Sequence, residues 1–265
     1  MIKKLLRRLD RVLMNFELYR LFKDKIGKRY VLELFLSAKN QRVRLEDCVF
    51  DVSSPLISPK IKSALLTGNY ESEERDFFRK YVPYEDPLVE LGGSIGVLSC
   101  ITNKCLEPPN DHLVVEADPE LAELLEQNRE LNDCNFGIVS SAIGYDSETV
   151  SLHRKGEVIL GSTTNKTGVT ETISVPAVTL EGAIREKFDG PFNLICDIEG
   201  TEHDLVREET DLLQRRVKYL LIELHDSPEA NSPKHTIDRL LDADFELLEK
   251  TGAVYCLRNR KLSPE

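Results

Sequence analysis

A glycine-rich turn and an acidic residue further along the chain occupy positions from which they could bind a ligand. The turn, residues 90–96 (ELGGSIG), follows a short apolar stretch and leads into a predicted helix. Glu116 ends the next apolar stretch and is followed by Ala117 and Asp118. Ligands of open α/β sheets bind at the carboxyl ends of the strands, near the point where the strand order reverses. We therefore expect both motifs to face one ligand.

The residue types in these motifs favour a nucleoside that carries a positive charge. Glu90 precedes the glycines and suits an ammonium group, while Glu116 could accept charge-assisted hydrogen bonds from both ribose hydroxyls. A nicotinamide dinucleotide is the alternative, although its GxGxxG fingerprint requires glycine where this chain has Ser94. Three glycines let the backbone approach a ligand closely, and these are Gly92, Gly93 and Gly96.

A second group of polar residues follows two later apolar stretches. Asp197 and Glu199 come after one stretch, and Glu223 and His225 come at the end of the next. A carboxylate or histidine at this rim can accept a proton from a substrate hydroxyl. We predict Asp197 as the first candidate for that role, followed by His225 and then Glu199. Helix capping is the alternative role for such acids.

The carboxyl ends of the strands are also where a metal ion or an adenine base would bind. We predict no metal site, with Mg²⁺ held by Asp197, Glu199 and Glu223 as the alternative, because oxygen ligands suit that ion. Ser141 and Ala142 lie near the end of the third predicted strand. Their small side chains leave room for a flat base, so we expect them to line the adenine site.

Apolar stretches that alternate with helical ones predict the sheet that positions these residues. The clearest helix, residues 119–131, begins with proline, as helix N-termini prefer. Two final strands separated by Thr251-Gly252 are expected to form an antiparallel hairpin. The sequence therefore predicts an α/β fold with a seven-stranded, mostly parallel sheet, whose strands lie at 88–92, 112–118, 136–144, 192–200, 217–226, 245–250 and 253–259.

In this order and spacing the motifs resemble those of the FkbM-type methyltransferases. The family's patterns are D-V-G-A-N-x-G, F-E-P-x-P, K-I-D-V-E-G-x-E, E-x-H and an upstream Y-E pair. The matching segments are 90–96, 115–119, 195–202, 223–225 and Tyr70-Glu71. This chain departs from the patterns at Glu90 and Ser94, where the family has Asp and Asn, and at Ala117 and Ile195, where it has Pro and Lys.

The resemblance implies a Rossmann-like class I methyltransferase that uses S-adenosylmethionine, with Tyr70 and Glu71 added to the cofactor-binding residues. It also implies O-methylation, often of sugar hydroxyls on glycans, glycolipids or natural products. An NAD(P)-dependent sugar oxidoreductase and a non-catalytic binding module with the same fold are the alternative functions.

Charge is distributed unevenly along the 265 residues. The chain has a net charge of -11, but residues 1–30 hold ten lysines and arginines against three acids, so the remainder carries -18. The strongly acidic remainder of the chain argues against nucleic acid as a partner. We expect residues 1–60 to form a basic helix with accessory strands, and residues 61–265 to form the methyltransferase domain.

The basic segment at residues 2–26 is predicted to be an amphipathic helix with two alternative partners. Its apolar stripe could pack on the catalytic domain or on a second copy of the chain. It could instead anchor the protein to an anionic membrane, which would place a cytoplasmic protein at the inner membrane face. We expect no secretory signal, because no apolar core and cleavage site follow the basic start.

Overall fold

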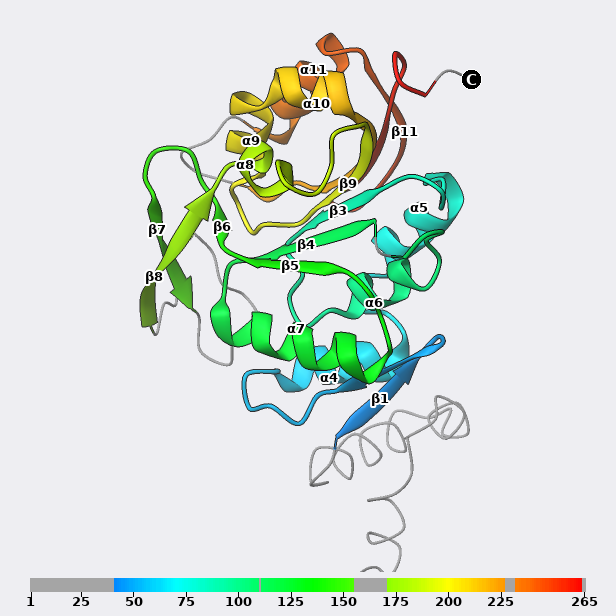
Figure 1. Ribbon diagram of the computed structural model, residues 1–265, viewed down its shortest axis with the longest axis vertical. Helices are drawn as coiled ribbons and strands as arrows, with labels where there is room; N and C mark the ends of the chain where they lie inside the picture. Colours follow the sequence, from blue (N-terminus) through cyan, green and yellow to red (C-terminus); the bar gives the residue numbers. More distant parts are fainter. Residues whose placement is uncertain (1–40, 110, 155–170, 227–231, 264–265) are drawn as a thin grey trace, which may run out of the picture.

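The computed structural model describes residues 41–109, 111–154, 171–226 and 232–263, and a seven-stranded sheet forms their centre. The strand order is β11-β12-β10-β9-β3-β4-β5 (Figure 1). Strands β10, β9, β3, β4 and β5 run parallel, whereas β12 pairs antiparallel with both β10 and β11. The strands are Leu88–Leu91 (β3), His112–Glu116 (β4), Gly137–Ser140 (β5), Phe192–Cys196 (β9), Val217–Glu223 (β10), Phe245–Thr251 (β11) and Val254–Asn259 (β12).

This sheet confirms the predicted fold class, including the antiparallel last hairpin. The chain leaves β3 toward β4 and β5 on one side, and later strands lie on the other side of β3. The order therefore reverses between β3 and β9, and ligand sites of open α/β sheets form at such a point. The parallel strands β3, β4 and β9 are buried along their whole length, as expected where helices cover both faces of a sheet.

Helices cover the two faces in separate layers (Figure 1). One layer packs on the core that contains Leu205, Leu213 and Leu240; its helices are Leu180–Ile184 (α8), Glu202–Glu208 (α9), Thr210–Arg216 (α10) and Pro233–Asp242 (α11). The other packs on the core that contains Ile95 and Leu125; it comprises Pro59–Thr67 (α4), Val97–Asn103 (α6) and Pro119–Leu131 (α7). Ser72–Tyr81 (α5) contacts α6, β10 and β12.

Helix starts near the sheet follow from local sequence. Asp118 caps α7 by accepting from the backbone N–H of Glu120, and Pro119 occupies the first turn. Ser58 caps α4 in the same way through Ile61 N–H, and Thr179 caps α8 through Gly182 N–H. Because a cap fixes where the chain turns, these residues also fix the loops between strand and helix.

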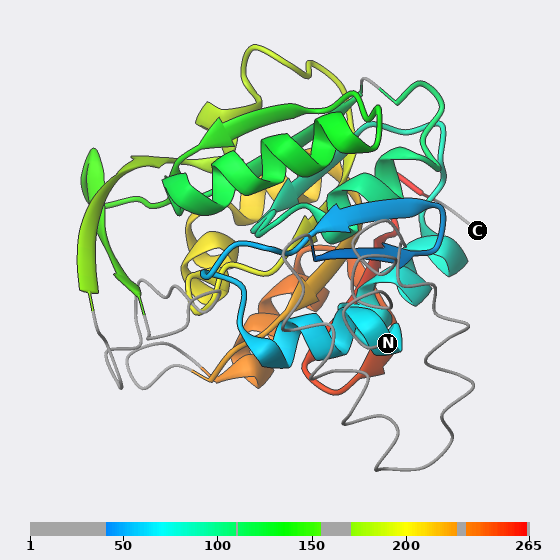
Figure 2. The same ribbon diagram turned by 90° about the horizontal axis from the view of Figure 1, so that it is seen from below.

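A two-stranded hairpin lies outside the helix layer of α4 and α7. Its strands, Arg42–Leu45 (β1) and Cys48–Asp51 (β2), turn at Glu46-Asp47. Asn132 donates to Val49 O and accepts from Val49 N–H, which ties the hairpin to α7. Viewed from below, the hairpin, α4 and α7 lie on one face of the sheet (Figure 2). The sequence pattern of residues 29–53 predicts short strands with a turn at residues 39–40. That turn and the predicted basic helix fall within residues 1–40, which lie outside the described part.

Two further segments differ from the sequence prediction. The sequence pattern of residues 56–82 predicts a loop and one helix ending near Tyr81, whereas the structure has two helices, α4 and α5, with Gly68 at φ +78° between them. The strand expected at 136–144 is split, because its end, Ala142–Ile143 (β6), pairs with a second sheet. That sheet has the order β6-β8-β7 and contains Thr149–Arg154 (β7) and Glu171–Val178 (β8), which the periodicity did not predict.

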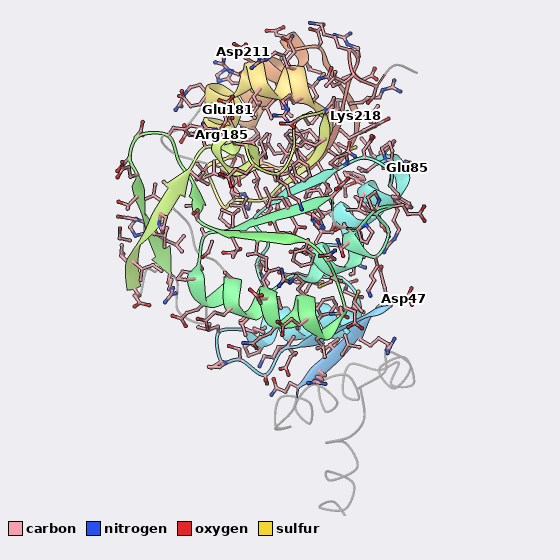
Figure 3. All side chains as sticks on the ribbon, in the orientation of Figure 1. Asp47, Glu85, Glu181, Arg185, Asp211 and Lys218 are labelled. Atoms are coloured by element: carbon pink, nitrogen blue, oxygen red, sulfur yellow. The ribbon has the colours of Figure 1, made fainter. Side chains whose placement is uncertain are left out.

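The exterior of the described chain is strongly charged. Labelled side chains such as Asp47, Glu181 and Asp211 lie at the periphery and are exposed (Figure 3). No helix among the described residues is long and apolar enough to span a bilayer.

Candidate active site

A cavity of about 300 Å³ opens over the carboxyl ends of β3, β4 and β9. Loops after these three strands supply part of its wall, and α4, residues 69–71, α7, β6 and β7 supply most of the rest. This is the position at which the strand order reverses. The structure brings eleven sequence-predicted residues to its wall: Tyr70, Glu71, Gly92, Ser94, Glu116, Ala117, Asp118, Ser141, Ala142, Asp197 and Glu199.

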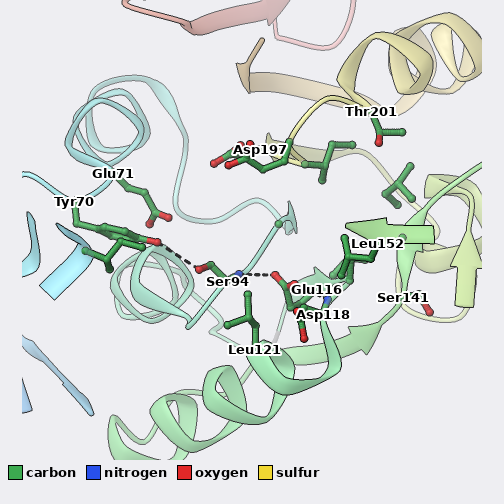
Figure 4. A pocket seen from close by; sticks show the side chains of 18 of the residues that line it. Tyr70, Glu71, Ser94, Glu116, Asp118, Leu121, Ser141, Leu152, Asp197 and Thr201 are labelled. Carbon is green, nitrogen blue, oxygen red and sulfur yellow. Dashed lines mark hydrogen bonds between the residues drawn. The ribbon is translucent and has the colours of Figure 1, made fainter. Parts of the chain in front are cut away.

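Glu116 is buried at one end of the cavity and is held by backbone donors (Figure 4). Ser94 N–H donates to its Oε2 at 2.6 Å, and Asp118 N–H donates to its Oε1 at 2.8 Å. Burial raises the pKa of Glu116 to about 7, although these backbone hydrogen bonds act in the opposite direction. Each carboxylate oxygen can accept a further hydrogen bond, so Glu116 is oriented by the loop and still able to bind a pair of hydroxyls.

Gly92 allows the turn to pass close to the end of β9. Its φ is +93°, and a Cβ built on it would lie 1.7 Å from the backbone oxygen of Asp197. Any side chain would therefore separate the turn from the strand that carries Asp197. Gly96 begins α6 with φ +82°, and its Cβ would meet Leu125 Cδ1 at 2.6 Å. The turn is thus required for close packing as well as for access to a ligand.

Three members of the predicted turn do not line the cavity. Gly93 and Gly96 pack beneath it against α7. Glu90 is 2% exposed, accepts from Ser99 Oγ at 2.8 Å and has Oε2 at 3.5 Å from His112 Nε2. The Glu90 carboxylate therefore joins β3 to α6 and β4 below the turn. This placement differs from the expectation that Glu90 faces a ligand's ammonium group.

Small and apolar residues form the wall beyond Glu116. Ser141, Ala142 and Ile143 lie on it, and Leu152 joins them from β7. Leu152 was missed because β7 belongs to the second sheet, and nothing in its sequence ties it to the cofactor motifs. A wall of small and apolar residues suits an aromatic base, so the adenine site predicted at Ser141 and Ala142 stays a prediction.

Tyr70 and Glu71 reach the cavity from the start of α5. Tyr70 Oη lies 3.4 Å from Ser94 Oγ. Glu71 adopts a left-handed conformation with φ +47°, and its Oε2 is buried and accepts no hydrogen bond from the described residues. Burial and the nearby acid Glu74 raise the pKa of Glu71 well above its ordinary value. Figure 4 shows Glu71 and Asp197 approaching one another across the cavity.

A cluster around His225 adjoins the cavity at Asp197, although His225 itself does not line it. His225 Nε2 lies 3.9 Å from Asp197 Oδ1, 3.6 Å from Glu199 Oε2 and 3.8 Å from Glu223 Oε1. These four residues come from the ends of β9 and β10. The structure thus brings together all the predicted catalytic residues.

Glu202 fixes the orientation of the histidine. It is completely buried, accepts from the N–H groups of Ile198 and Gly200, and lies 3.0 Å from His225 Nδ1. Its carboxylate therefore holds the loop that leads into α9 and does not cap that helix.

Charge in the cluster shifts two pKa values in the same direction. Burial, followed by the charges of Glu223 and Glu199, raises the pKa of Asp197 well above its ordinary value. Burial alone would lower the pKa of His225, but the hydrogen bond to Glu202 and the charges of Glu202, Asp197 and Glu199 outweigh it and raise that pKa to about 10. His225 therefore holds a proton near neutral pH more readily than a free imidazole does.

Comparison with known proteins places the chain among methyltransferases. A sequence model described as Methyltransferase FkbM domain matches residues 92–247. No protein of curated function matches the chain in sequence.

Similar solved structures share low sequence identity with the chain. A precorrin-6y C5,15-methyltransferase from Geobacter metallireducens is 12% identical, with a TM-score of 0.44 and coverage of 70% of this chain and 86% of that one. M. jannaschii TYW2 in complex with AdoMet is 12% identical, with a TM-score of 0.43 and 83% of each chain covered. Aeropyrum pernix fibrillarin with natively bound S-adenosyl-L-methionine is 13% identical, with a TM-score of 0.41 and 67% of each chain covered.

Proposed function

This chain belongs to the FkbM methyltransferase family, whose sequence model matches more than half of it, and we propose that it methylates a hydroxyl group of a sugar, glycan or glycolipid. The observation that supports this most is one cavity with a backbone-held carboxylate, Glu116, at one end and the acid Asp197 at the other (Figure 4). The first can hold a nucleoside, and the second can meet a hydroxyl beside it.

The residues of the cavity fit S-adenosylmethionine, the cofactor of this family. Glu116 has acceptor capacity for two ribose hydroxyls, and the wall of Ser141, Ala142 and Leu152 suits the adenine. The buried Oε2 of Glu71 has no hydrogen-bond donor among the described residues. A positively charged amino acid moiety would satisfy it. We therefore assign the ammonium contact to Glu71 instead of Glu90.

Acidity on the Asp197 side of the cavity supports a neutral acceptor. Among the described residues that line the cavity, Lys60 is the one lysine or arginine. On the Asp197 side, Glu71, Asp197 and Glu199 contribute carboxylates. A phosphate-rich acceptor such as nucleic acid would be repelled, because its backbone requires lysine and arginine contacts. A polyhydroxylated acceptor can instead donate hydrogen bonds to these carboxylates.

The side chains divide the work of the reaction as follows. When bound, S-adenosylmethionine supplies an electrophilic methyl group. Asp197 orients the acceptor hydroxyl and accepts its proton, and its raised pKa suits a base that works near neutral pH. His225 and Glu199 are the second and third candidates for the proton. The walls of the cavity align the reacting atoms, which is a major source of rate enhancement in such transfers.

The test is a transfer assay with S-adenosylmethionine labelled in the methyl group. The full chain would be incubated with panels of sugars, glycolipid head groups and, as a control, RNA, after calorimetry has established that the cofactor binds. Label in a sugar that is lost with Asp197→Asn supports the proposal. Label in RNA alone would overturn the acceptor class, and no cofactor binding would favour a non-catalytic module.

Residues 1–26 lie outside the described part, and we propose two testable roles for them. Either the segment packs on residues 61–265 or on a second copy, or it holds the protein on an anionic membrane. Flotation with anionic liposomes at low salt, with and without residues 1–26, separates these roles. Flotation of the full chain alone supports the membrane role. Failure to float, with aggregation or a changed subunit count after deletion, supports the packing role.

A further inference from the structure

The cluster at the ends of β9 and β10 has the spacing of a metal site. One ligand atom from each of Asp197, Glu223 and His225 lies within 4.8 Å of the other two. The Nε2 atom of His225 is 3.9 Å from Asp197 Oδ1 and 3.8 Å from Glu223 Oε1, too far for hydrogen bonds. Ligands about 2.1 Å from one octahedral ion are about 3.0 Å apart when adjacent and about 4.2 Å apart when opposite. The observed spacings fall between these values.

An unsatisfied oxygen provides a second and independent observation. Oδ1 of Asp197 is buried and accepts no hydrogen bond from the described residues. It is also the oxygen turned toward His225 Nε2. A buried carboxylate oxygen without a donor is unfavourable, and proteins pair such atoms with donors or cations. The missing partner therefore belongs in the space between Asp197 and His225.

Charge around the histidine is not balanced by the described residues. The ion pairs found for Asp197, Glu202 and Glu223 in the described chain are all with His225. One imidazole cannot neutralise three carboxylates, even when it is protonated. A divalent cation would supply the remaining charge at the centre of the cluster.

The orientation of His225 is compatible with metal binding. Its Nδ1 meets the buried Glu202 at 3.0 Å, so Nε2 is directed toward the carboxylates. Histidines that bind metals commonly donate their other ring N–H to a carboxylate in this way. Glu202 would then be a positioning residue: it would orient His225 without binding the cation itself.

We propose that Asp197, Glu223 and His225 bind a divalent cation of the Mg²⁺ or Mn²⁺ class. This inference rests on the proposed function, because the open coordination positions would face the acceptor hydroxyl. The cation would orient that hydroxyl and ease the loss of its proton. Oδ1 of Asp197 would bind the cation, which leaves Oδ2 to meet the acceptor. The two carboxylates suit Mn²⁺, and we choose this ion as the probe because it is paramagnetic.

The experiment is an electron paramagnetic resonance titration of the full chain with Mn²⁺, without cofactor or acceptor. We expect one bound ion per chain, with nitrogen modulation in the pulsed spectrum from His225. Glu223→Gln and His225→Asn should each weaken binding at least tenfold, and His225→Asn should remove the nitrogen signal. Asp211→Asn, on the exposed surface of α10, is the matched control and should bind Mn²⁺ as the parent does.

Two outcomes would overturn the metal site. One is no Mn²⁺ binding, which would leave a protonated His225 as the counter-charge of the cluster. The other is binding that persists in Glu223→Gln and His225→Asn variants whose thermal unfolding remains cooperative. Calorimetry with S-adenosylmethionine on the same samples separates this failure from failure of the proposed function, since cofactor binding without Mn²⁺ binding rejects the metal site alone.

Discussion

The two sides of the cavity satisfy their carboxylates in opposite ways. On the cofactor side, which comprises residues 92–96 and 116–118, Glu116 accepts two backbone N–H groups, and Asp118 caps α7 and pairs with Arg154. On the acceptor side, Asp197 and Glu199 line the cavity and Glu223 and His225 adjoin it. The Nε2 atom of His225 lies 3.6–3.9 Å from the three carboxylates. The carboxylates of the first side are satisfied by groups of the folded chain. The carboxylates of the second side concentrate negative charge that a ligand would balance.

This difference suggests that the cofactor side contributes binding and the acceptor side contributes proton transfer. Backbone donors cannot be moved without moving the strands, so the cofactor side offers a fixed shape for a nucleoside. On the acceptor side, the carboxyl of Asp197 has a raised pKa, which helps a catalytic base to exchange protons. Substitutions on the acceptor side should therefore change turnover, and those on the cofactor side should change affinity.

Asp197→Asn should produce the largest effect. It keeps the shape of the side chain but removes its charge, so we expect the turnover number to fall roughly 10²–10⁴-fold with both substrates saturating. Steady-state kinetics with the labelled cofactor would measure this, with Asp211→Asn as the control. Turnover close to that of the parent would assign the role of base to His225. It would also contradict the proposal that substitutions of Asp197 mainly change turnover.

Glu116→Ala should produce the next largest effect, on affinity alone. Two ribose hydroxyls would lose a charged acceptor, which costs on the order of 1.5–3 kcal/mol, or roughly 10- to 150-fold in the dissociation constant of S-adenosylmethionine. Calorimetry would measure it. Glu120→Ala, four residues along the chain and half exposed, is the matched control and should bind normally. Equal affinities of the two variants would show that Glu116 does not contact the ribose.

Lower pH should weaken cofactor binding by a smaller factor. The pKa of Glu116 is raised to about 7, and only the ionised carboxylate accepts from both hydroxyls. Affinity should therefore fall about tenfold between pH 8 and pH 6, and Glu116→Gln should lose this dependence. A parent profile as flat as that of the glutamine variant would contradict the assignment.

The contribution of Glu116 to the stability of the ligand-free protein should increase as pH falls, which is opposite to its effect on cofactor affinity. A carboxyl whose pKa rises on folding stabilises the fold below its ordinary value of 4.5. That stabilisation is lost as pH rises through about 7. The stability of the parent relative to Glu116→Gln should thus fall across this window, which denaturation at several pH values would show.

Sequence alone predicted the sheet and the position of the glycine turn and Glu116 at the ends of its strands, for physical reasons. Parallel strands buried on both faces give apolar runs, and their ends carry the glycines and Glu116 that a ligand requires. The direction of Glu90 could not be predicted, because a strand buried on both faces gives no alternation to orient a side chain. Likewise, β7 and β8 are mostly exposed or half-buried and pair across a separation of 17 residues or more, so their apolar pattern is weak.

The acceptor side was predicted as a list of residues but not as an arrangement. Asp197, Glu199, Glu223 and His225 follow from motif positions at two strand ends. Their convergence on one imidazole depends on Glu202, whose carboxylate is held by the N–H groups of Ile198 and Gly200. That geometry comes from the loop between β9 and α9, and a pattern of residue types does not encode it.

Ser94→Asn should have the smallest effect and would sharpen the comparison most directly. Ser94 has φ +48°, a conformation that serine adopts at a cost and asparagine tolerates better, so the free energy of unfolding should rise by about 0.5 kcal/mol. Its backbone N–H, not its side chain, donates to Glu116. Affinity for S-adenosylmethionine should therefore stay within about twofold of the parent. Ser94→Ala, which also loses the hydroxyl near Tyr70 but gains no tolerance of this φ, is the matched control and should not be stabilised. Denaturant unfolding and calorimetry on the three proteins would decide. A marked loss of affinity in both variants would show that the cofactor side uses the Ser94 side chain, and its fixed backbone would then not account for binding.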